Sequence, residues 1–227
     1  MSGILYIVST PIGNLQDITY RALSTLKEVD IIACEDTRVT RKLLSKYSIK
    51  NKLITYNDVN ERRMTDSIVS KLINGQNIAL VSDAGTPCIS DPGYRLVNSS
   101  ILKDINVVSI PGPSSVQSAL SISGLPSDSY YFQGFLPRKK GRKTKMEKLK
   151  QYDCTIIIFE SPKRVKKTLN DIHFYFGNRV VSVCKEISKI YEKVFMDNIE
   201  NLINLFESQN LKGEYVILVA KEGYQIL

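Results

Sequence analysis

The sequence predicts a two-domain α/β protein whose N-terminal half folds around a mainly parallel sheet. In roughly the first 110 residues, short apolar runs alternate with amphipathic stretches at the spacing of βαβ units. After the turn-rich Pro-Gly-Pro-Ser-Ser at 111–115 the pattern changes and strands outnumber helices. The chain has 227 residues, of which 43% are hydrophobic and 24% charged, and this is ample to bury a core.

In the N-terminal half we expect five strands connected by helices. Asn60 is a candidate helix cap, and the helix after it has an apolar face that ends before a stop signal at Gly75. Ligands of open parallel sheets gather beyond the carboxyl ends of the strands, so the loops there are the candidate site. The predicted strands are 4–9, 31–34, 53–56, 78–81 and 106–110, and the predicted helices are 17–29, 37–47, 60–74 and 92–102.

In the C-terminal half we expect a second α/β domain with a mixed sheet. One helix follows residue 115, and two clear helices interrupt the later strands, one beginning after Ser161-Pro162 and one at 199–207. The predicted domains are 1–112, the N-terminal α/β domain, and 113–227, the C-terminal α/β domain, which contains a basic segment at 138–150. The predicted strands are 130–135, 155–160, 179–185, 190–196 and 215–220.

The positive charge is concentrated in one segment. Residues 138–150 hold eight basic residues and one acidic residue, and so contribute +7 of a net charge of +8. Local positive charge is typical of a surface that binds a polyanion, and nucleic acid is the favoured partner, with other anionic surfaces as alternatives. The structural alternative is a solvated helix of like charges.

Several classes of protein conflict with the sequence. Apolar runs are far shorter than the ~20 residues that span a bilayer, and the N-terminus lacks the basic region of a secretion signal. A single histidine, His173, provides neither a zinc site nor a convincing Cys-His or Ser-His-Asp arrangement. The cysteines have no Cys-x-x-Cys spacing, and we expect them in strands of a protein from the reducing cytosol. They are Cys34, Cys88, Cys154 and Cys184.

The loop after the fourth predicted strand, residues 82–93, is the most unusual, since it is rich in Gly, Pro, Ser and Asp. Glycine lets a backbone approach a ligand closely, and proline makes a loop rigid. Neither a P-loop nor a Gly-x-Gly-x-x-Gly fingerprint is present. The residues alone therefore indicate a cofactor-binding α/β enzyme of unspecified type that acts near an anion.

The motifs in these loops occur in the same order in one family. They are Ser-Thr-Pro-Ile-Gly-Asn at 9–14, Glu-Asp-Thr-Arg at 35–38, Ser-Asp-Ala-Gly-Thr-Pro at 82–87, Pro-Gly-Pro-Ser-Ser at 111–115, Gly-Leu-Pro-Ser-Asp at 124–128 and Gly-Phe-Leu-Pro at 134–137. From about residue 4 to 220 the chain resembles the ribosomal RNA small subunit methyltransferase I family of the tetrapyrrole methylase superfamily.

The resemblance implies a two-domain, tetrapyrrole-methylase-like (class III methyltransferase) fold, with helices on both faces of the N-terminal sheet and a mixed C-terminal sheet. It implies a cytoplasmic enzyme, usually a homodimer, that uses S-adenosyl-L-methionine and no metal. Family members methylate the ribose 2′-hydroxyl of a cytidine in the decoding region of 16S ribosomal RNA. The implied partner is thus the small ribosomal subunit, and neither DNA nor a membrane.

Site residues carry over from the family motifs onto this sequence. Glu35 matches the carboxylate proposed as a base in relatives, Asp36 lies beside it, and Arg38 could bind a phosphate or pair with these acids; alternatively, residues 35–38 are a salt-bridged helix start. The basic segment becomes an RNA phosphate clamp. The implied methyl-donor residues are Pro11, Gly85, Thr86, Ile89, Ser114, Ser115 and Glu160, and the RNA-binding candidates are Arg138, Lys139, Lys140, Arg142, Lys143 and Lys145.

Two other functions compete with this interpretation. A methyltransferase of the sirohaem or cobalamin pathways would also suit a basic cleft, because its tetrapyrrole substrate carries carboxylates. A non-catalytic RNA-binding protein on a methylase fold is the alternative from another class. The chain also departs from its family at residues 57–60, where Asn-Asp-Val-Asn replaces the common His-Asp-His-Asn.

Overall fold

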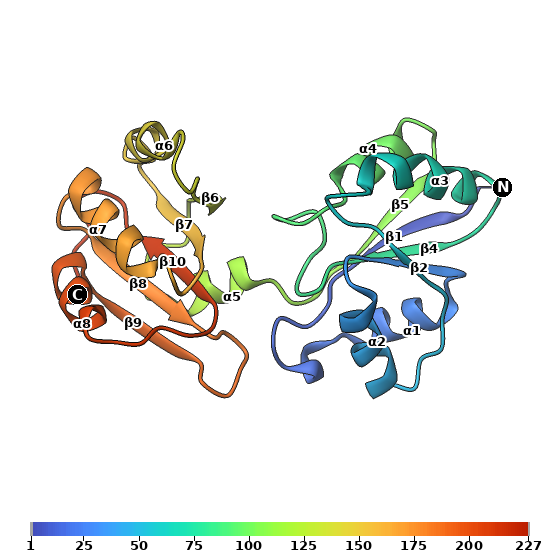
Figure 1. Cartoon of the computed structure of the whole chain (residues 1–227), viewed down its shortest axis with the longest axis horizontal. Coiled ribbons are helices and arrows are strands. Elements are labelled where there is room, and N and C mark those ends of the chain that lie inside the picture. Colours follow the sequence, from blue (N-terminus) through green and yellow to red (C-terminus); the bar gives the residue numbers. More distant parts are fainter. Residues whose placement is uncertain (1, 227) are drawn as a thin grey trace. The chain divides into compact units, whose positions relative to one another are not determined.

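The computed structural model describes residues 2–226 and divides into two compact units. The first unit runs to Ser114, and the second begins at Ser115. This division lies two residues beyond the predicted boundary between residues 112 and 113. Figure 1 labels most of the elements of both units, and each unit is described by itself below.

The first unit is built on a sheet of five strands, as predicted, and the sheet is fully parallel where the sequence predicted a mainly parallel one. The strand order is β3-β2-β4-β1-β5, so the first strand of the chain pairs with the fourth and the fifth. The strands are β1 (Ile4–Val8), β2 (Ile31–Cys34), β3 (Leu53–Thr55), β4 (Ile78–Val81) and β5 (Asn106–Ile110). The helices are η1 (Leu15–Asp17), α1 (Tyr20–Glu28), α2 (Thr37–Lys46), α3 (Glu61–Ile73) and α4 (Tyr94–Ile101).

Both faces of this sheet are covered, because successive side chains of a strand point to opposite faces. In β4, Ile78 and Leu80 pack in the cluster that contains α3 and α4 side chains. Ala79 and Val81 pack in the cluster that contains α1 and α2 side chains. The central strands β2 and β4 are therefore buried on both faces, and the chemistry is left to the loops at the strand ends.

The second unit contains a five-stranded mixed sheet in the order β6-β7-β10-β8-β9. Strands β6 and β7 are parallel, and the other neighbours are antiparallel. One face packs in a core with α6, α7 and α8, and the other packs with α5. The elements are α5 (Ser115–Ile122), β6 (Tyr130–Phe135), α6 (Arg142–Leu149), β7 (Thr155–Glu160), α7 (Val165–Phe176), β8 (Val180–Lys185), β9 (Lys193–Asn198), α8 (Ile199–Glu207) and β10 (Tyr215–Val219).

Four elements differ clearly from the predictions. Helix α1 begins at Tyr20 instead of residue 17, because Leu15–Asp17 form a separate short helix, η1, and Thr19 caps α1. The basic segment contains a helix, α6, which buries Met146 and Leu149 in spite of its like charges. Strand β9 begins at Lys193 instead of residue 190, because the residues before it form a turn held by hydrogen bonds between Glu186 and Lys189 and between Lys189 and Glu192. Helix α7 begins at Val165, since Ser161–Arg164 form a separate hydrogen-bonded turn.

The cysteines only partly follow the expectation that they lie in strands. Cys34 and Cys184 are buried in β2 and β8, whereas Cys88 lies in the loop after β4 and Cys154 directly precedes β7. Over residues 2–226, no helix is both long enough and apolar enough to cross a lipid bilayer.

Candidate active site

The loops that follow β1 and β4 are joined by their backbones at the carboxyl edge of the first unit's sheet. Thr10 and Gly85 exchange two backbone hydrogen bonds, each 2.9 Å long. The Thr10 hydroxyl also donates to the carbonyl oxygen of Ser82 at 3.1 Å. Because strands β1 and β4 are direct neighbours, these bonds fix the two loops against each other just beyond the sheet.

Hydrogen bonds between hydroxyl groups connect the loop after β5 to the two loops that follow β1 and β4. The Thr86 hydroxyl donates to the carbonyl oxygen of Pro113 at 3.2 Å, and its oxygen lies 3.0 Å from the Ser9 hydroxyl oxygen. A threonine has one hydroxyl hydrogen, so the Ser9 hydroxyl is the donor in the second bond. Ser9, Thr86 and Pro113 thereby connect the ends of β1, β4 and β5.

Gly85 allows these loops to approach closely. It is buried, and its φ of +83° is strained for residues with a side chain. A Cβ atom at this position would lie 3.3 Å from Cγ2 of Ile12 and 3.9 Å from the carbonyl oxygen of Pro113. The glycine thus lets the three loops pack closely, while its own N–H and C=O groups are both paired with Thr10.

Four carboxylates gather beside these loops, at the ends of β2, β3 and β4. The backbone N–H of Asp36 donates to Oδ1 of Asp83 at 3.0 Å, and the Asp83 backbone in turn donates to the Glu35 carboxylate. The negative charges of Asp91 and Asp58 also act on Glu35. The ends of the neighbouring strands β2 and β4 are therefore linked through their acidic residues.

Burial and mutual repulsion raise the pKa values of three of these acids. Burial is the largest cause for Glu35, followed by the charges of Asp83 and Asp91. Burial is also the main cause for Asp83. For Asp91, burial and the charges of Asp83 and Asp58 raise the pKa to about 6, although a hydrogen bond from Ser82 opposes the shift. Such carboxylates accept protons more readily than exposed ones.

Asp36 and Arg38 have the opposite character. The Asp36 side chain caps α2 by accepting a 2.8 Å hydrogen bond from the Arg38 backbone, and its carboxylate pairs with the Arg38 guanidinium at 2.6 Å. These hydrogen bonds lower the pKa of Asp36 to about 2. Asp36 is thus a weak proton acceptor, and its pair with Arg38 is the salt-bridged helix start that we considered as the alternative.

The structure brings together part of the predicted donor-binding set. Pro11 and Gly85 are buried in the two joined loops, and Thr86 is the centre of the hydroxyl hydrogen bonds that connect the three loops. The side chain of Ile89 is exposed in the loop after β4. Ser114 is the last residue of the first unit, and Ser115 is the first residue of α5.

Glu160, the remaining residue of that set, has its carboxylate fully engaged inside the second unit. One oxygen accepts hydrogen bonds from the Ser161 backbone at 2.8 Å and pairs with Arg164 at 2.7 Å. The other oxygen accepts from the Thr168 hydroxyl at 2.7 Å. The side chain is completely buried. This geometry supports a structural role for the carboxylate rather than contact with a ligand.

The predicted RNA-binding residues divide into surface residues and one buried residue. Arg138, Lys139, Lys140 and Lys143 are exposed, and Lys145 is half-buried. Arg142 is buried, and its guanidinium donates to Asp171 at 2.6 Å, to the Thr168 hydroxyl at 2.8 Å and to the carbonyl oxygen of Pro137 at 3.2 Å. We therefore revise the prediction for Arg142, because these bonds hold its charge inside the unit and away from RNA.

The sequence reasoning did not single out Asp83 and Asp91. Both lie in the loop at 82–93 that attracted attention for its composition, so their position was suspected but not their role. Their action on Glu35 depends on β4 lying next to β2, a pairing that skips β3 in the chain order. Among residues 2–226, no group of three or more His, Cys, Asp or Glu side chains has the arrangement of a metal site.

Comparison with known proteins identifies the family. Residues 4–203 match the family model of the tetrapyrrole (corrin/porphyrin) methylases. A ribosomal RNA small subunit methyltransferase I from Halalkalibacterium halodurans is 47% identical over 225 residues, which cover 99% of this chain and 78% of the relative. The protein of that name from Thermotoga maritima is 45% identical, over 97% of this chain and 100% of the relative. The chain belongs to the ribosomal RNA small subunit methyltransferase I family.

As a member of the ribosomal RNA small subunit methyltransferase I family, the chain shares its fold with solved structures of other methylases. A uroporphyrin-III-C-methyltransferase from Thermus thermophilus matches with a TM-score of 0.66 at 19% identity, over 96% of this chain and 94% of that chain. A cobalt precorrin-4 methyltransferase matches with a TM-score of 0.68 at 19% identity, over the same shares. At these identities the likeness shows the fold alone, and it confirms the predicted tetrapyrrole-methylase-like class.

Proposed function

We propose that this protein transfers a methyl group from S-adenosyl-L-methionine to the ribose 2′-hydroxyl of a cytidine in the decoding region of 16S ribosomal RNA. Membership of the family supports the methyl transfer, and the names of relatives that are 45–48% identical support a ribosomal RNA acceptor. We infer the cytidine 2′-hydroxyl as the methylated group from the family motifs in the sequence. The observation that carries the chemistry is Glu35, a carboxylate with a raised pKa at the carboxyl edge of the sheet.

The loops of the first unit fit the methyl donor chemically. S-adenosyl-L-methionine, when bound, supplies an electrophilic methyl group on a positively charged sulfur. The joined loops of Pro11, Gly85 and Thr86 offer a rigid backbone and small side chains against which such a molecule can be held. The neighbouring carboxylates favour its positive charge. We assign Ile89, Ser114 and Ser115 to the same role on the family motifs.

Glu35 is the proposed base. A ribose hydroxyl is a poor nucleophile until its proton is removed, and a carboxylate with a raised pKa is suited to accept that proton. Burial and the charges of Asp83 and Asp91 raise the pKa of Glu35, although a hydrogen bond with the Asp83 backbone opposes the shift. Asp36, with a pKa of about 2, instead fixes the start of α2 and holds Arg38.

Four exposed cations of the basic segment and the half-buried Lys145 are the proposed RNA contacts of the second unit. Arg138, Lys139 and Lys140 lie in the turn after β6, and Lys143 and Lys145 lie on α6. Contacts to phosphates hold an RNA in position without reading its bases, so the choice of nucleotide depends on other features of the acceptor. On the family resemblance, the enzyme acts on the small ribosomal subunit in the cytoplasm as a homodimer.

The direct test is methyl transfer to small ribosomal subunits that lack the modification. The subunits are incubated with the protein and isotope-labelled S-adenosyl-L-methionine, and the nucleosides are then identified by mass spectrometry. We expect label in 2′-O-methylcytidine. Label in a base-methylated nucleoside would overturn the proposed atom, and no label despite tight donor binding in calorimetry would overturn the proposed acceptor.

A further inference from the structure

Helix α2 and the loop after it carry a second concentration of positive charge, on the first unit. Between Asp36 and Asp58 the chain has six basic residues and no acidic residue. Acidic residues elsewhere in the first unit offset most of this positive charge, so the net charge of the unit does not show the cluster. Except for Arg38, none of the six is in an ion pair among residues 2–226. The six are Arg38, Arg41, Lys42, Lys46, Lys50 and Lys52, and all are exposed.

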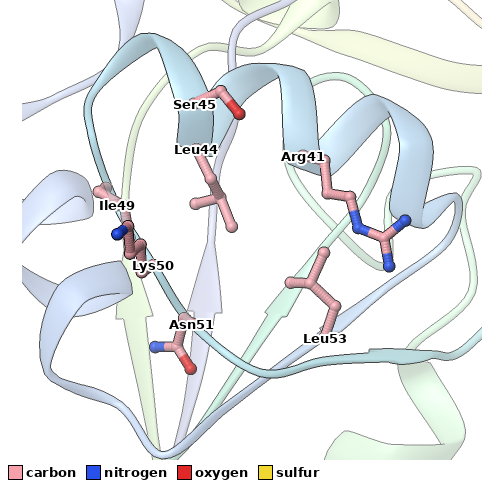
Figure 2. Close-up of a pocket in the computed structure, with 7 residues that line it drawn as sticks. All are labelled: Arg41, Leu44, Ser45, Ile49, Lys50, Asn51 and Leu53. Carbon is pink, nitrogen blue, oxygen red and sulfur yellow. The ribbon is translucent and has the colours of Figure 1, made fainter.

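A pocket of about 290 Å³ lies within this cluster, between α2 and the edge strand β3. Leu44, Ile49 and Leu53 supply its apolar surface. Figure 2 shows Arg41, which extends from α2, on the opposite side of the pocket from Lys50. Leu44 and Ile49 are buried, so the partly exposed Leu53 is the apolar residue that a sugar could pack on while the cations on either side bind phosphates.

The pocket is rigid, because the loop that carries Lys50 is fixed on both sides. The Asn51 amide donates to the carbonyl oxygens of Leu26 and Val29 at 3.0 and 2.7 Å. The Ile49 backbone bonds to the carbonyl oxygen of Leu44 at 2.9 Å, which closes the end of α2. A site whose backbone is already ordered loses less entropy when it binds a ligand.

The position of the cluster connects it to the catalytic edge within the same unit. Helix α2 starts two residues after Glu35, and Arg38, Lys42 and Lys46 follow one another at four-residue intervals along it. Residues at this spacing form a row on one side of a helix. The row extends roughly 12 Å from the carboxylates toward the loop with Lys50. An RNA strand bound along it would lead to Glu35.

We infer that α2 and the loop at 47–52 form a second RNA-binding surface, in which Arg41 and Lys50 hold backbone phosphates at the pocket. RNA as the acceptor is part of the proposed function, so this surface depends on that proposal. It adds contacts on the unit that carries Glu35, separate from those of the basic segment at 138–150.

Salt dependence of RNA binding tests the surface. We would measure the fluorescence anisotropy of a labelled 20-nucleotide polycytidine RNA with the full chain between 0.05 and 0.5 M KCl. The variants are Arg41→Gln/Lys50→Gln and a matched control, Lys71→Gln/Lys103→Gln, which removes the same charge from α3 and from the turn after α4. Each phosphate contact on a single strand contributes about 0.7 to the slope of log affinity against log salt.

We expect the Arg41/Lys50 variant to lose about 1.4 from that slope, so the affinity advantage of the unmodified protein shrinks about 25-fold as the salt rises from 0.05 to 0.5 M. The control should keep the full slope, and melting temperatures show whether each variant is folded. A slope equal to that of the control, in a protein that still transfers methyl groups to small subunits, would overturn the second surface alone. If the unmodified protein neither binds the RNA nor transfers methyl groups, the proposed function fails and the second surface fails with it.

Discussion

Replacing Asp91 with Asn should stabilise the protein at neutral pH and not in acid. The pKa of Asp91 is raised from 3.8 to about 6, with burial as the largest cause. The folded protein therefore holds this proton more tightly than the unfolded chain does. Stability consequently falls as the pH rises from about 4 to 6, and the full penalty persists above pH 6. Asn carries no charge at any of these pH values, so the variant avoids the penalty.

The size of the effect follows from the shift. About two pKa units correspond to about 3 kcal/mol, at 1.36 kcal/mol per unit. Because Asp91 is only half-buried, solvent screens part of this energy, and we expect about half, roughly 1.5 kcal/mol. For a chain of this size, each kcal/mol raises the melting temperature by about 2–4 °C. The Asp91→Asn variant should thus melt about 3–6 °C higher at pH 8.

Thermal unfolding followed by circular dichroism at pH 4, 5, 6 and 8 measures the gain. Asp66→Asn is the matched control, since it removes the same charge from an exposed position on α3. We expect the gain of Asp91→Asn to appear between pH 4 and 6 and then to remain constant. A gain that is the same at every pH, or no larger than that of Asp66→Asn, would refute the account of the carboxylate cluster.

Two further predictions compare neighbouring or matched positions. Arg142→Ala should lower the free energy of unfolding in urea by about 3 kcal/mol, because it leaves Asp171 without its ion-pair partner. Lys143→Ala should change that free energy by less than about 0.5 kcal/mol and should weaken RNA binding. Equal losses of stability would contradict the division of the basic segment into a buried residue and surface residues. Gly85→Ala and Gly141→Ala should each cost about 1–2 kcal/mol, since both glycines have φ near +80°. Only Gly85→Ala should lower the affinity for S-adenosyl-L-methionine measured by calorimetry, because a Cβ at Gly141 meets nothing within 4 Å. Equal donor affinities of the two variants would remove Gly85 from the donor site.

Much of the fold was predictable because local pattern and tertiary structure agree. The strands at 31–34, 78–81 and 106–110 were predicted with their observed bounds; the first two are apolar runs that the sheet buries, and all three stand between turn signals. Helix α6 was not identified as one of the clear helices, because its charges mask a short apolar face. Its burial of Met146 and Leu149 depends on the partners that the tertiary fold supplies.

The candidate site was predictable in its location but not in the roles of its members. The sequence placed Glu35 in a loop at the carboxyl edge, and the structure adds the two aspartates that raise its pKa. Asp36 and Glu35 are adjacent acids with opposite pKa shifts, and only the partners in the fold distinguish them. Arg142 likewise resembles its basic neighbours in sequence, and its burial against Asp171 follows from the packing of α6 on α7.

Glu35→Gln tests the central chemical claim most directly. Gln has nearly the same shape as Glu and cannot accept the proton, so the variant separates catalysis from binding. We would measure single-turnover transfer of labelled methyl groups to unmodified small ribosomal subunits, together with donor affinity by calorimetry. The account predicts a 10²- to 10⁴-fold slower transfer with donor affinity unchanged within about twofold. Transfer at the rate of the unmodified protein would contradict it.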